Sequence, residues 1–133
     1  MSTCQAIGFP LKAGKKRMIT KPKKVNKIWG HEIWLANNEN EDYCGKILHV
    51  NAGQGSSMHY HMDKHETFYV LKGQLELELL DTRDGSRSIV ILCEGDGYEI
   101  EQGQPHKLAA GIDTDIIEIS THHRDEDSHR LWR

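Results

Sequence analysis

Short β-forming segments bounded by turn residues recur along this chain at a spacing of about ten residues. The clearest one, 74–79, alternates strictly, with leucine at 75, 77 and 79 and glutamate at 76 and 78. Successive side chains of a strand point to opposite faces, so this pattern predicts a strand with one buried face. Asp84 and Gly85 then form a hairpin turn signal before the apolar run 88–93.

Three more segments, 46–50, 67–71 and 115–121, have β-rich composition, and no segment has a convincing helical period. Many short strands at this spacing favour an all-β sandwich or small barrel. The 133 residues suffice for one domain with a single core, and an apolar content of 37% is typical of a globular protein.

Charge is divided unevenly along the chain. Residues 1–31 hold eight lysines or arginines and no acid, whereas the remainder holds nine basic residues and all twenty acids. We therefore predict a basic N-terminal arm, 1–26, that is flexible or packed on a partner, followed by one domain, 27–133. The basic residues of the arm, at 12–24, are not interleaved with aromatic residues, so we favour a solvated tail over a nucleic-acid-binding segment.

No apolar run approaches the roughly 20 residues needed to span a bilayer, and the N-terminus does not resemble a secretory signal. The three cysteines, Cys4, Cys44 and Cys93, are widely spaced and odd in number. We expect free thiols in a cytoplasmic protein. We also expect Cys93 to be buried as a small apolar residue.

Histidine and glutamate give the strongest chemical signal. His59 and His61 are two residues apart, which places both rings on one face of a strand. Glu66 opens the next strand, and His106 lies forty residues further along. Three imidazoles and one carboxylate suit one divalent ion such as zinc, manganese, iron or nickel, and they leave positions open for substrate.

The spacing of these residues resembles the two motifs of the cupin superfamily, Gly53-x5-His59-x-His61-x4-Glu66-x6-Gly73 and Gly95-x7-Gly103-x2-His106. The resemblance covers about residues 27–121 and implies a double-stranded β-helix, or jelly-roll barrel, with a metal inside its mouth. Glu101 and Ala110 stand where the family usually has proline and asparagine, and neither position is a ligand.

Two shorter resemblances point to sugar chemistry. The segments Lys27-Ile-Trp-Gly30, Ile116-Ile-Glu-Ile119 and Asp125-Glu-Asp127 are similar to parts of type II phosphomannose isomerases. The pattern His59-x-His61-x-x-Lys64-x-Glu66 is similar to that of D-lyxose isomerases. Both imply an aldose–ketose isomerase that uses its metal as a Lewis acid on a sugar or sugar phosphate.

Four residues receive roles on this hypothesis. Lys64 is the candidate acid–base or sugar-positioning residue, provided that burial and the metal depress its pKa; the alternative is a solvated turn lysine. Lys46 and Arg130 are candidates for holding a phosphate, although Arg130 also has acids nearby at 125–127. Phe68 is on the same strand face as Glu66 and is expected to form the apolar pocket wall.

Two alternatives remain open: an Fe(II)-dependent cupin dioxygenase, and a cupin that binds a sugar without catalysis. We expect a homodimer, because pairing covers the exposed faces and edges of small jelly rolls. The expected partner is a small-molecule sugar or sugar phosphate, with no membrane and no nucleic acid.

Overall fold

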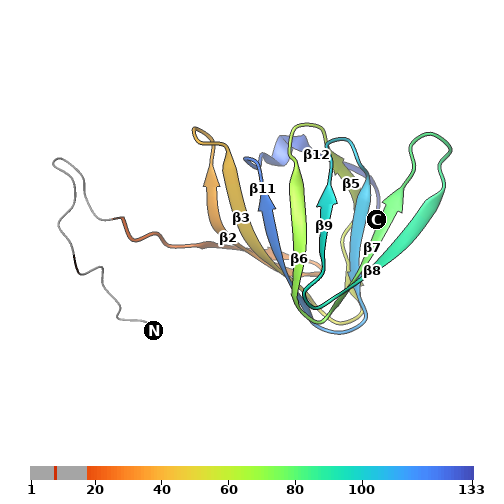
Figure 1. Cartoon of the computed structure of the whole chain (residues 1–133), viewed down its shortest axis with the longest axis horizontal. Coiled ribbons are helices and arrows are strands. Elements are labelled where there is room, and N and C mark those ends of the chain that lie inside the picture. Colours follow the sequence, from red (N-terminus) through yellow and green to blue (C-terminus); the bar gives the residue numbers. More distant parts are fainter. Residues whose placement is uncertain (1–7, 9–17) are drawn as a thin grey trace.

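The computed structural model describes Gly8 and residues 18–133. The fold is almost entirely β, with two antiparallel sheets that face each other and one short 3-10 helix (Figure 1). The first sheet has the order β1-β2-β3-β11-β6-β9, and the second has the order β12-β5-β10-β7-β8, with β4 paired to β10. This arrangement confirms the predicted all-β jelly-roll class.

The elements follow one another along the chain as β1 Lys23–Lys27, β2 Gly30–Asn38, β3 Tyr43–Val50, β4 Gln54–Gly55, β5 Met58–His61, β6 Glu66–Lys72, β7 Gln74–Leu80, β8 Arg87–Cys93, β9 Gly97–Ile100, β10 His106–Ala110, β11 Thr114–Ser120, the 3-10 helix η1 Asp125–Asp127, and β12 Ser128–Trp132. Every strand predicted from the sequence is present. The hairpin turn at Asp84 and Gly85 joins β7 to β8, as expected.

Alternation along the strands builds the core between the sheets. On β7, Leu75 and Leu77 are fully buried, and they meet Phe68 and Val70 of β6 in one apolar cluster. Burial of such side chains stabilises the fold by about 1.5–3 kcal/mol each. The same inward-facing rows continue into polar residues near the mouth of the barrel, where Lys46, Glu66 and Glu118 are also buried.

The turn between β6 and β7 depends on Gly73. Its φ of +94° lies in the region that side chains with a Cβ rarely adopt, and a Cβ there would lie 2.5 Å from the Thr114 hydroxyl oxygen. This motif glycine therefore lets the chain turn tightly against β11 and pass from the first sheet into the second.

Two sequence expectations need correction. Cys93 is exposed rather than buried, because Leu92 fills the inward position at the end of β8 and the next residue faces outward. The predicted arm lies largely outside the described residues, but Lys23–Lys27 form β1 and pair with β2. The first sheet thus begins four residues before the expected boundary. The described part of the chain contains no helix with the length and hydropathy to cross a bilayer.

Candidate metal centre and pocket

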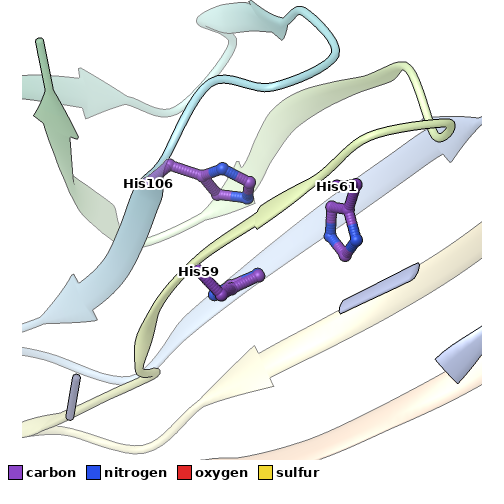
Figure 2. Close-up of side chains that lie close together, drawn as sticks. All are labelled: His59, His61 and His106. Carbon is purple, nitrogen blue, oxygen red and sulfur yellow. The ribbon is translucent and has the colours of Figure 1, made fainter. Parts of the chain in front are cut away.

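Three histidines converge between neighbouring strands of the second sheet. His59 and His61 extend from the same side of β5, and His106 extends from β10, where it pairs with His59 across the ladder. Figure 2 shows the three rings turned toward a common space. One ring nitrogen from each lies within 4.8 Å of the others, which is close enough for all three to bind one metal ion.

Hydrogen bonds at the other ring nitrogen fix the orientation of each imidazole. The Nδ1 atoms of His59, His61 and His106 lie 2.8, 3.1 and 2.9 Å from the carbonyl oxygens of Ser57, Asp127 and Gln104. A carbonyl oxygen only accepts, so Nδ1 carries the proton in each ring and the lone pair remains on Nε2. This is the second-sphere arrangement of a metal-binding histidine.

The histidine rings of β5 are also neutral. Burial, followed by the neighbouring His106, lowers the pKa of His59 to about 3. Burial, followed by the Lys64 ammonium, lowers the pKa of His61 to about 2. Neutral rings with exposed lone pairs are the form that binds a metal ion.

Glu66 supplies a fourth acceptor to the same space. Its Oε2 atom lies 3.4 Å from Nε2 of both His61 and His106. Glu66 Oε2 and His106 Nε2 are buried and have no hydrogen-bond partner within the described chain. Buried acceptors that face one another without a donor are unfavourable unless a cation lies between them. The residues therefore fit the divalent ion that the sequence predicted.

Asp127 holds the loop that joins the histidine strand to the glutamate strand. Its carboxylate accepts the backbone N–H groups of Met62, Asp63 and Lys64 at 2.9–3.2 Å. Burial alone would raise the pKa of this carboxyl, but the three N–H donors lower it below its usual value. One residue of η1 thus fixes both this loop and, through its carbonyl oxygen, the ring of His61.

Lys64 is buried and surrounded by acceptors. Its Nζ atom lies 3.2 Å from Glu118 Oε2, 3.1 Å from His123 Nδ1 and 3.6 Å from Glu66 Oε1. Burial would lower the pKa of Lys64, but Glu118 and Glu66 outweigh it and raise the pKa instead. Burial thus does not depress the pKa of Lys64 as its acid–base role required, because two carboxylates, which the sequence alone did not reveal, flank this amine. The solvated turn lysine is excluded by burial, since only 3% of the residue is exposed.

The metal centre opens into a cavity of about 450 Å³. Lys46, Phe68 and Arg130 all line it, and their roles in binding a substrate stay predictions. Lys46 Nζ lies 3.6 Å from Glu32 Oε1 and 4.2 Å from the centre of the Trp34 ring. Arg130 lies on β12 and, within the described chain, has no ion pair to the acids at 125–127.

Two cavity residues, Glu118 and His123, were not predicted as site residues. Glu118 is buried between two lysines; burial would raise its pKa, but Lys64 and Lys46 lower it, so the carboxylate is ionised. His123 donates to exposed Asp125 through Nε2, and burial followed by Lys64 lowers its pKa. The segment 115–121 has no regular alternation, because Ile116 and Ile117 are adjacent, so no sequence pattern marked Glu118 as an inward residue. No pattern marks His123 either, because it follows the end of β11.

Comparison with known families decides the classification. The model of the cupin domain matches residues 46–119, which is more than half of the chain. This protein belongs to the cupin family. The matched segment contains all four residues of the candidate centre.

Solved structures agree with this cupin fold. CapF, a capsular polysaccharide assembling protein from Staphylococcus aureus, matches 86% of the chain and 33% of its own with a TM-score of 0.75 at 15% identity. Oxalate decarboxylase from Bacillus subtilis, as a variant with one tryptophan changed to tyrosine, matches 83% of the chain and 30% of its own with a TM-score of 0.71 at 17% identity. The cupin therefore spans about a third of these proteins, and the likeness concerns the fold alone. A search of curated proteins gives no match.

Proposed function

We propose that this cupin binds one divalent metal through His59, His61, Glu66 and His106, and that it interconverts an aldose and the corresponding ketose. The observation that carries the proposal is the convergence of buried acceptor atoms at the inner end of an open cavity. A divalent ion supplies Lewis-acid polarisation of a carbonyl group when bound. The proposal covers zinc, manganese, iron and nickel, which all accept this ligand set.

The cavity wall suits a ligand rich in hydroxyl groups. Its volume lies within the roughly 300–1,000 Å³ typical of small-molecule sites. Ser57, Glu118 and His123 supply donors or acceptors, whereas Phe68 and Leu108 form apolar surface. This mixture is expected for an open-chain sugar, which has polar edges on a short carbon backbone.

Cations near the cavity support an anionic group on the substrate. Lys27 and Arg130 are exposed residues that line the cavity, and neither has a carboxylate within ion-pair distance in the described chain. Buried Lys46 lies deeper inside, where its charge is already paired with Glu32. A sugar phosphate would therefore find its charge compensated at this end of the cavity.

Within the proposal, Glu118 rather than Lys64 presents a free acceptor atom to the substrate. The hydrogen bonds that Glu118 accepts from Lys64 and Ser120 both end on Oε2, which leaves Oε1 for a substrate proton. Glu118 and Glu66 raise the pKa of Lys64, so its side chain stays an ammonium, which has no lone pair with which to take a proton.

Deuterium exchange tests the reaction. The metal-loaded protein, incubated with a panel of sugars and sugar phosphates in deuterated water, should introduce deuterium at the carbon beside the carbonyl. His59→Ala is the control and should show no exchange. No exchange across the panel with metal bound would exclude the isomerase. Oxygen uptake with Fe(II) would instead support the dioxygenase, and sugar binding without turnover would support the non-catalytic alternative.

A further inference from the structure

The two oxygens of Glu66 have different surroundings. Oε2 is directed at His61 and His106, at 3.4 Å from each Nε2. Oε1 lies 3.6 Å from the Nζ atom of Lys64. The carboxylate is 2% exposed, so water does not compete for either oxygen. One oxygen therefore belongs to the group of ligand atoms, and the other belongs to an ion pair.

Lys64 is fixed at this position from three sides. Its Nζ atom donates to Glu118 Oε2 at 3.2 Å and contacts His123 Nδ1 at 3.1 Å, and its backbone N–H donates to Asp127 Oδ2 at 3.0 Å. An ammonium has three donors, and Glu118, His123 and Glu66 supply three acceptors. Movement of the Lys64 side chain away from Glu66 Oε1 is unfavourable, because it would leave buried charges unpaired.

We propose that Lys64 is a positioning residue: it holds Glu66 Oε1 in an ion pair, so that Glu66 binds the metal through Oε2 alone. Carboxylates bind metals through one oxygen or two, so an Oε1 without the Lys64 ion pair is available as a second ligand atom. Binding through one oxygen keeps two positions of an octahedral ion open for substrate oxygens. The inference rests on the proposed metal centre but not on the identity of the substrate.

Manganese(II) is the probe for this proposal. Bound Mn(II) accelerates the relaxation of water protons in proportion to the number of water molecules that it coordinates. The full chain loaded with Mn(II) should hold about two such waters, because four of six octahedral positions are protein ligands. In Lys64→Met, Glu66 gains its second oxygen as a ligand, and the relaxation enhancement should fall by about half.

Lys46→Met is the matched control. Lys46 is a second buried lysine of the same cavity, but its ion pair is to Glu32 rather than to Glu66. Both variants remove one positive charge near the metal, so both should bind Mn(II) somewhat more tightly. Only Lys64→Met should change the relaxation enhancement, which separates positioning of Glu66 from the simple loss of charge.

Equal relaxation enhancement in the wild type and in folded Lys64→Met would overturn the proposal. If that variant does not fold, infrared difference spectra of the wild type on metal loading decide instead. A wide splitting of the carboxylate stretches, absent in Glu66→Gln, would support binding through one oxygen, and a narrow splitting would contradict it. Failure of the wild type to bind Mn(II) would overturn the metal centre itself, whereas bound metal without sugar exchange would leave this inference intact.

Discussion

At the scale of single residues, the candidate centre is a set of groups whose protonation states are fixed by burial. His59 and His61 donate through Nδ1 to backbone carbonyls and present neutral Nε2 atoms to the same space. Their pKa values, about 3 and about 2, lie far below the ordinary value of 6.5. Neutral rings in the folded state are ready to bind a metal, but they also make the folding stability of the protein depend on pH.

The metal-free protein should lose stability below pH 6.5. Between pH 6.5 and about 3, the unfolded chain binds protons on these two rings and the folded chain does not. The free energy of unfolding therefore decreases as the pH is lowered. Each ring contributes up to about 1.4 kcal/mol per pH unit. Urea unfolding with a chelator present should show a loss of about 2 kcal/mol or more between pH 6.5 and 5.

His61→Gln tests the origin of this pH dependence. Removing one of the two rings should reduce the slope by about half in the same pH range. An unfolding free energy that stays constant from pH 7.5 to pH 5 in the wild type would contradict the neutral, buried state of these histidines.

Sequence reasoning succeeded for the four converging residues and failed for the surroundings of Lys64. His59, His61 and Glu66 lie on adjacent short segments, so strand alternation alone places them on inward faces. The environment of Lys64 depends on Glu118, which is 54 residues away and reaches it through pairing of β6 with β11. Such cross-strand proximity has no local signal in the sequence.

At the scale of secondary-structure elements, η1 and β12 hold the metal side of the cavity in place. β12 pairs with β5 along the histidine strand, and η1 brings the Asp127 carboxylate to the backbone of the loop after β5. Neither element was predicted, because 125–130 is polar and the whole segment 125–132 lacks alternation. β7 was predicted correctly because leucine and glutamate alternate along it, and β11 because of its β-rich composition.

Asp127→Ala should loosen this side of the centre. The change removes a charged acceptor from three backbone N–H groups, of which only that of Lys64 belongs to a buried residue, and costs about 1–3 kcal/mol of folding stability. Weaker orientation of His61 should lower metal affinity by about 10-fold or more. Metal titration and thermal unfolding measure the two effects.

Glu126→Ala is the control for the change at Asp127, because Glu126 is its exposed neighbour in η1. It should leave both metal affinity and thermal stability unchanged. Equal metal affinity in Asp127→Ala and Glu126→Ala would show that the contacts of η1 do not support the centre.

At the scale of the whole molecule, the charge division seen in the sequence does not coincide with a structural boundary. β1 carries lysines of the basic segment, yet it forms the edge of the first sheet, and Lys23 lies 4.7 Å from the centre of the Trp34 ring. Lys27 of the same strand lines the cavity. The end of the basic segment is therefore part of the cupin body, next to the proposed anionic substrate.

The homodimer stays a prediction, and the outer face of the first sheet is the surface that suits it. Ile33, Ile47, Ile117 and Tyr69 are paired in one row across β2, β3, β11 and β6. They alternate with inward residues such as Lys46, Phe68 and Glu118, so this apolar row faces away from the core. Apolar sheet faces of this kind are commonly covered by another copy of the chain.

Metal analysis of the purified full chain tests the central claim most directly. Wild-type protein, and the control His129→Ala, which changes a histidine on exposed β12, should each contain close to one divalent ion per chain. His59→Ala and His106→Ala should each lose that ion, because each removes one of the converging ring nitrogens. Retention of a full equivalent of metal in both folded variants would contradict the assignment of this centre.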